Sequence, residues 1–83
     1  MSKPPVLKAK ELIKIVEKLG FINTRNKGSH FFFKNKNGRT TVIPVHSGKT
    51  IGLGLMRSIL KDIGMSADEF RLRKSNIPHG EDP

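Results

Sequence analysis

The chain has 83 residues, room for one small domain, with a formal net charge of +9 and no cysteine. The lack of cysteine excludes disulfides, thiol nucleophiles and zinc–thiolate sites. No segment approaches the roughly 20 apolar residues that cross a bilayer. The first ten residues also lack the apolar run of a signal peptide, so we expect a cytoplasmic protein without membrane contact.

The positive charge is concentrated in the first 50 residues of the chain. The 44 residues between Glu17 and Asp62 hold nine lysines and arginines and no acid. Surfaces that only confer solubility usually mix both signs of charge. The acid-free window therefore favours a polyanionic partner, for which nucleic acid is the default. A purely solubilising surface is the alternative.

The first expected element is an amphipathic helix over about residues 8–19. Its apolar side chains recur at helical spacing: Leu12, Ile13, Val16 and Leu19. Gly20 suits the left-handed residue that ends a helix, and Phe21 can fold back towards the last turn. The sequence thus predicts a helix that stops at Gly20.

Three short segments of β type follow this helix. Residues 21–26 are weakly patterned, whereas residues 29–34 and 40–45 have strand composition. The last two are joined by a turn that contains Asn37 and Gly38, a strong hairpin signal. Because consecutive strands with short links pair as an antiparallel meander, we expect a three-stranded antiparallel sheet.

A glycine-rich loop over residues 46–54, with no core of its own, leads to a second amphipathic helix that Gly64 ends. The apolar positions of this helix are Leu55, Met56, Ile59, Leu60 and Ile63. Ser66 and Glu69 form a capping-box pattern. They predict a short extra C-terminal helix that ends near Arg73.

These elements define the domain organisation. We predict one α+β domain over residues 8–73, an N-terminal extension of residues 1–7 and a disordered tail of residues 74–83, in which His79 is expected to be inert. Both main helices are expected on one face of the sheet. Two helices can cover only one side of three strands, so the other side faces water or a partner.

Strand alternation assigns the side chains of residues 29–34 to two faces. Phe31 and Phe33 belong under the helices, which leaves His30, Phe32 and Lys34 on the open side. Next to a histidine and a lysine, an exposed phenylalanine suits the stacking of bases.

The same alternation applies to the neighbouring strand. Ile43 and Val45 suit the core, which leaves Pro44 and His46 on the open side. Both His30 and His46 are therefore expected to point out from the same face of the sheet.

A histidine in an acid-free basic region suits metal-independent cleavage of RNA. Such cleavage needs a base for the 2′-OH proton, positive charge for the phosphorane and an acid for the leaving oxygen. Histidine titrates near neutrality, and Lys27, Lys34 and Lys49 would supply the charge. A two-metal nuclease needs carboxylates, which the middle of the chain lacks, so we expect no metal or other cofactor. An ordinary surface histidine is the alternative for His30.

The residues "GKT" at positions 48–50 do not form a nucleotide-hydrolysis loop. That motif requires glycine five positions before Gly48, where the chain has Ile43. The segment leads into a helix N-terminus near Lys49 and Arg57, so it is either a phosphate-binding loop or a flexible connector.

Three segments resemble the HicA (YcfA/HicA) family of mRNA interferase toxins in order and spacing. They are "KELIKIVEKLGF", "NKGSHFFFKNKNGR" and "TVIPVHSGKTIGLGLMRSILKDIG", and together they cover about residues 9–70. Residues 28–30 are similar to the family's Gly-Ser-His segment, and the resemblance implies that His30 is catalytic. Residues 44–46 resemble a segment that often carries a second histidine. Residues 54–60 resemble the signature of the second helix.

The resemblance implies a fold like a double-stranded-RNA-binding domain, α-β-β-β-α. It also implies a type II toxin that cleaves mRNA as a ribosome-independent endoribonuclease, and a HicB-type antitoxin that covers the His30 face. The RNA-binding residues that we predict are Lys27, Gly28, Ser29, Phe32, Lys34, His46, Lys49 and Arg57. Two alternatives are a non-catalytic RNA-binding domain and a module that binds an acidic protein. The unpaired edges of so small a sheet leave the oligomeric state open.

Overall fold

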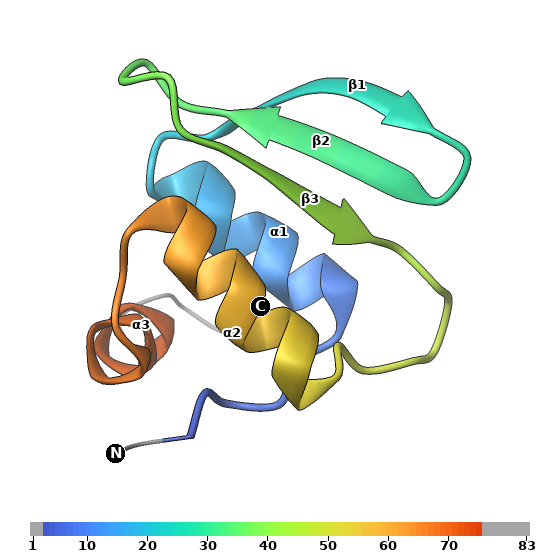
Figure 1. Cartoon of the computed structure of the whole chain (residues 1–83). Helices are drawn as coiled ribbons and strands as arrows, with labels where there is room; N and C mark the ends of the chain where they lie inside the picture. The colour runs from blue at the N-terminus through green and yellow to red at the C-terminus, as the bar shows by residue number, and fades with distance from the viewer. Residues whose placement is uncertain (1–2, 76–83) are drawn as a thin grey trace, which may run out of the picture.

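The computed structural model describes residues 3–75 as a helix, three strands and two further helices (Figure 1). The elements are α1 (Ala9–Lys18), β1 (Ile22–Lys27), β2 (His30–Lys34), β3 (Thr40–Pro44), α2 (Leu53–Ile63) and α3 (Ala67–Ser75). The strands pair in the order β1-β2-β3, and both pairs are antiparallel. Because α1 and α2 lie together on one side of the sheet (Figure 1), the predicted α+β architecture is confirmed. No helix in this part of the chain has the length and apolar character to span a membrane.

The end of α1 follows from one glycine. Gly20 has a φ of 98°, in the region that favours glycine, and its N–H donates to the Glu17 carbonyl at 3.0 Å. The N–H of Phe21 donates to the Val16 carbonyl, also at 3.0 Å. These two bonds form a Schellman motif, and Phe21 is buried beneath the turn. The predicted helix stop is confirmed.

The predicted capping box of α3 is also confirmed. The N–H of Glu69 donates to the Ser66 hydroxyl at 3.1 Å, and the N–H of Ser66 donates to Glu69 Oε1 at 3.0 Å. The helix continues past Arg73 to Ser75, so the first two residues of the predicted tail are helical. The rest of that tail, with His79, lies outside the described residues.

The turn between β2 and β3 is closed by a single asparagine. The Asn35 carbonyl accepts the Gly38 N–H at 3.1 Å, and Asn35 Oδ1 accepts the N–H groups of Asn37 at 3.0 Å and Arg39 at 2.8 Å. A three-residue turn that ends in a positive-φ glycine is a common hairpin connection. The predicted hairpin is therefore confirmed.

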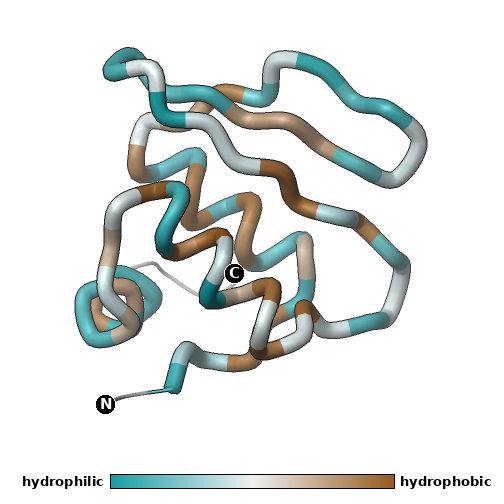
Figure 2. Tube along the Cα trace, viewed as in Figure 1, coloured by the Kyte–Doolittle hydropathy of each residue, from teal (hydrophilic) through white to brown (hydrophobic). Residues whose placement is uncertain are grey.

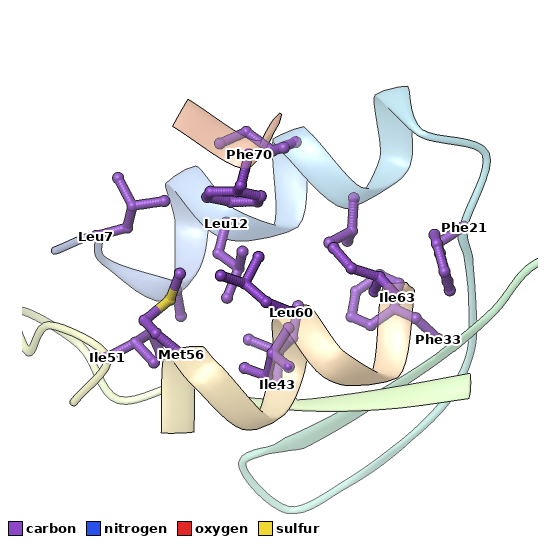
Figure 3. Close-up of a cluster of buried hydrophobic side chains, with 14 residues drawn as sticks. Leu7, Leu12, Phe21, Phe33, Ile43, Ile51, Met56, Leu60, Ile63 and Phe70 are labelled. Carbon is purple, nitrogen blue, oxygen red and sulfur yellow. The ribbon is translucent and has the colours of Figure 1, made fainter. Parts of the chain in front are cut away.

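The hydrophobic core lies between the two main helices and the inner face of the sheet (Figure 3). Its largest fully buried side chains are Phe33, Phe70, Leu7, Leu12, Ile43, Met56, Ile59 and Val16. Figure 2 shows hydrophobic and hydrophilic residues alternating along the helices, and hydrophilic residues along most of β1 and in the turn between β2 and β3.

Two core residues come from segments in which no core residue was predicted. Leu7 of the predicted extension and Ile51 of the glycine-rich loop are both buried, and the Ile51 N–H donates to the Leu7 carbonyl at 2.7 Å. A bridge between Lys8 and Thr50 continues this pairing. The fold therefore includes residues before position 8. The loop has no separate core, and its Ile51 joins the core of the domain together with Leu7 and Met56.

Asp62, the first acidic residue after the acid-free window, connects α2 to β3 and to the turn before it by two hydrogen bonds. Asp62 Oδ2 accepts a hydrogen bond from the Thr41 hydroxyl at 3.0 Å, and the Asp62 carbonyl accepts one from Arg39 Nη1 at 3.1 Å. Thr41 is buried, so its hydroxyl needs this partner.

We expect Thr41→Val to lower the free energy of unfolding by about 1–2 kcal/mol, because it removes a hydrogen bond to a charged group. Urea denaturation measures this change. Thr40→Val is the matched control, since Thr40 is exposed on the other face of β3 and its replacement should cost less than about 0.5 kcal/mol. Equal losses in the two variants would contradict a stabilising role of the Thr41–Asp62 bond.

Candidate functional site

The sheet leaves one face uncovered by helices. Directly opposed residues of antiparallel strands carry their side chains on the same face. His30 lies opposite Lys27 and Pro44, and Phe32 lies opposite Arg25 and Val42. We call this surface the open face, and it comprises Ile22, Arg25, Lys27, His30, Phe32, Lys34, Thr40, Val42 and Pro44. The other faces of β2 and β3 carry the buried side chains, so the predicted orientation of His30, Phe32 and Lys34 is confirmed.

A tight turn positions His30. Gly28 and Ser29 connect β1 to β2, and Gly28 adopts a φ of 58°, which a side chain would disfavour. The Ser29 carbonyl accepts the N–H of Val45 at 2.7 Å, so the turn is bound to the residue directly after β3. This anchoring fixes the backbone of His30 at the start of β2.

The His30 side chain is available to a ligand. It is exposed, and within residues 3–75 it forms no hydrogen bond or ion pair with the protein. Lys27 is its direct neighbour across the strand pair, a position in which Cβ atoms are about 5 Å apart. The imidazole of His30 thus lies beside the side chain of Lys27 on this surface.

Arg25 belongs to the same surface, although it was not predicted as a site residue. Its guanidinium carbon lies 4.5 Å from the centroid of the Phe32 ring. Guanidinium groups stack on aromatic rings and on bases alike. Arg25 could have been predicted from the sequence, because a two-residue turn at Gly28 and Ser29 places Arg25 opposite Phe32.

A β-bulge at Thr24 shapes the outer strand. The register shifts between Asn23 and Arg25, and Asn23 Nδ2 donates to the Phe32 carbonyl and to Asn26 Oδ1, both at 2.9 Å. Bulges of this kind reorient the side chains that follow them and disfavour pairing with another strand. All six residues of β1 are exposed.

His46 does not share the register of His30. β3 ends at Pro44, so strand alternation does not extend to His46. The residues that line a pocket with His46 come mainly from α1 and from the helix side of the sheet: Lys8, Lys10, Ile13, Phe31 and Val45. The expectation that both histidines point out from one face is therefore corrected, and a role of His46 in RNA binding stays a prediction.

The two remaining predicted residues lie apart from the open face. Lys49 is exposed in the loop between β3 and α2, where its N–H closes a turn on the His46 carbonyl at 3.1 Å. Arg57 belongs to α2 and lines a pocket with Pro4 and Lys61 on the helical side of the molecule. The structure thus brings six predicted residues together on the first hairpin: Lys27, Gly28, Ser29, His30, Phe32 and Lys34.

The open face offers no ligand set for a metal ion. Nowhere in residues 3–75 do three histidine, cysteine or acidic side chains lie close enough to share one. The ionisable side chains of this surface are those of His30 and three basic residues, and none is acidic.

Comparison with known proteins assigns the chain to a family. A family model described as the HicA toxin of bacterial toxin–antitoxin systems matches residues 9–65, which include the whole open face. The chain belongs to the HicA toxin family. The resemblance noted in the sequence is thereby confirmed, and α3 lies beyond the matched residues.

A curated relative from Pseudomonas fluorescens (strain Pf0-1) is named "Probable mRNA interferase HicA". It is 49% identical to this chain over 39 residues, which are 47% of the chain and 63% of the relative. The similarity thus spans less than two thirds of the relative's length.

We expect Arg25 and Phe32 to be energetically coupled by about 0.5–1 kcal/mol, the magnitude of an exposed cation–π contact. A double-mutant cycle of Arg25→Ala and Phe32→Ala, read by urea denaturation, measures this coupling. The control cycle pairs Lys34→Ala with Phe32→Ala and should give a coupling close to zero. Additive losses in the first cycle would show that the stacked geometry contributes nothing to stability.

Proposed function

We propose that this protein is the toxin of a type II toxin–antitoxin system and that it cleaves mRNA as a metal-independent endoribonuclease with His30 as its catalytic residue. The observation that supports this proposal most strongly is the position of the His30 side chain. Its unengaged side chain stands opposite Lys27 on a face without acids, in a chain of the HicA toxin family. The name of the Pseudomonas fluorescens relative supports the same activity.

The proposed reaction uses the 2′-OH of the RNA as the nucleophile. The His30 ring accepts the 2′-OH proton while the 2′-oxygen attacks the adjacent phosphorus. The bond from phosphorus to the 5′-oxygen then breaks, which gives a 2′,3′-cyclic phosphate and a 5′-hydroxyl that takes its proton from solvent. The ammonium group of Lys27 stabilises the negative charge that builds up on the phosphoryl oxygens.

The rest of the hairpin binds the strand that is cut. Phe32 and Arg25 offer planar groups on which bases stack, and Lys34 neutralises a phosphate. A Cβ atom added at Gly28 would meet no other atom within 4 Å, so the turn leaves open space for the RNA backbone close to His30. Contacts of this kind give affinity without reading sequence.

We further propose that a HicB-type antitoxin inactivates the protein by covering the open face, and that both act in the cytoplasm, where mRNA is found. The toxin–antitoxin family supports a protein partner. A basic surface with a half-buried aromatic ring suits a partner that presents acidic side chains, because complementary charge steers such complexes together.

We expect purified wild-type protein to cleave a long single-stranded RNA in excess EDTA, and His30→Ala to lose at least a hundredfold in cleavage rate, the usual contribution of a general base. Its RNA affinity should change little, since the lysines and arginines supply most of the binding energy. Gel analysis of the products and fluorescence anisotropy measure the two quantities.

His46→Ala is the matched control, because it removes a histidine that lies outside the open face. It should retain cleavage within a few fold. Full cleavage by His30→Ala would refute the proposed role of His30. RNA binding without cleavage by the wild type would instead favour a non-catalytic RNA-binding domain.

We expect a HicB-type antitoxin, taken from an adjacent reading frame that encodes one, to protect the open face. Amide hydrogen exchange, with and without this partner, should slow in β1, in β2 and in the turn between them, whereas the backbone of α2 should be unaffected. RNA should compete with the partner for the protein. Protection confined to the helices would contradict the proposed mode of inactivation.

A further inference from the structure

A second basic surface lies at the end of the sheet that is remote from His30. A groove forms there between the end of α1, the start of β1 and the turn from β2 to β3. We call it the lysine groove. The lining residues that matter here are Lys18, Leu19, Ile22, Thr24, Lys34 and Lys36.

The chemistry of the lysine groove suits one nucleotide. Three lysines line it, and among the described residues that line it none is acidic. Leu19 and Ile22 form an apolar wall. Ile22 is 70% exposed, although isoleucine side chains are usually buried. An apolar surface beside several cations accommodates the face of a base together with its phosphate.

The β-bulge helps to build this groove. With an unbroken register, Asn23 would lie opposite Lys34, but the bulge at Thr24 shifts the pairing and places Ile22 there instead. The side chain of Asn23 meanwhile donates to the Phe32 carbonyl and holds the bulge in place. The irregularity of β1 therefore sets an apolar side chain beside a lysine at the surface.

The lysine groove is continuous with the open face. Lys34 belongs to both, and β2 runs from His30 at one end to Lys34 at the other, about 13 Å at the usual rise of roughly 3.3 Å per residue. Figure 1 shows the two ends of this strand, with the β1–β2 turn at one end and the β2–β3 turn near the end of α1 at the other.

We propose that the lysine groove is a second RNA subsite, which holds a nucleotide of the same strand whose scissile phosphate lies at His30. This inference rests on the proposed function and adds the direction in which the RNA crosses the sheet. The RNA runs along β2, past Phe32 and Arg25, and ends in the groove a few nucleotides from the cut. Affinity should therefore rise with RNA length until both sites are filled. The length of RNA bound should be near the lower end of the ~4–16 nucleotides typical of small single-strand-binding domains.

The test measures RNA binding in a His30→Ala background, so that cleavage does not interfere. The groove variant carries Lys18→Ala and Lys36→Ala. The control carries Lys14→Ala and Lys61→Ala, which remove the same charge from exposed helix positions that do not line the groove. Fluorescence anisotropy is recorded with single-stranded RNAs of mixed sequence, from a dinucleotide to a decanucleotide, at several salt concentrations.

We expect the groove variant to bind the decanucleotide about tenfold more weakly than the control, with a salt slope lower by about 1.4 because each phosphate contact on a single strand contributes about 0.7. Affinity for the dinucleotide should be nearly equal in the two proteins. Thermal denaturation of both variants confirms that the exposed substitutions leave the fold intact.

A second pair of variants tests the apolar wall. Ile22→Ser should weaken binding of the decanucleotide several fold without changing the salt slope, since it removes no charge. Leu72→Ser is its control, because Leu72 is 67% exposed on α3 and does not line the groove.

Equal affinity and equal salt slope in the groove and control variants would overturn the proposal. So would a groove variant that binds RNA normally but no longer binds the antitoxin, because the groove would then be a protein contact. A wild-type protein that does not cleave RNA would refute the proposed function. The binding measurements would still decide whether the groove holds RNA.

Discussion

The arrangement of the open face depends on one constraint: two helices bury only one side of a small sheet. Phe33 and Ile43 are completely buried against that helical layer. Because strand side chains alternate, burial of Phe33 forces His30, Phe32 and Lys34 to the other side. A slip of one residue would expose a phenylalanine and bury a lysine, so packing energy fixes the register of the site. The hydrophobic core and the chemistry of the open face are thus two consequences of the same alternation.

The outer strand, β1, depends on its neighbour rather than on the core. All six of its residues are exposed, and it is held by pairing with β2, by the turn at Gly28 and by the hydrogen bonds of Asn23. Segments with few buried apolar contacts open more readily than the core. β1 nevertheless carries Arg25 and Lys27, so the residues next to His30 and Phe32 belong to the least buried strand of the sheet.

Four acidic side chains of the described chain have partners, and all four lie in the helices. Glu11 accepts the N–H of Lys8 at the start of α1, and Glu69 does the same for Ser66 at the start of α3. Asp62 binds Thr41, and Asp68 pairs with Arg71. Helix caps, one helix–sheet hydrogen bond and one ion pair within α3 therefore account for these four carboxylates. The open face carries Arg25, Lys27 and Lys34 and no acid, a charge pattern that favours a polyanionic ligand.

The sequence by itself determined the elements and the face on which His30 lies. Helix stops at glycine, capping boxes, hairpin turns and strand alternation depend on residues only a few positions apart, so they can be identified without knowledge of the fold. Tertiary structure alone decided the rest. Leu7 and Ile51 enter the core because two distant segments pair, and His46 lies beside α1 because β3 ends before it. The bulge that places Ile22 beside Lys34, and the register that stacks Arg25 on Phe32, arise from pairing between strands. The local sequence around one of these residues does not indicate which distant residue it will contact.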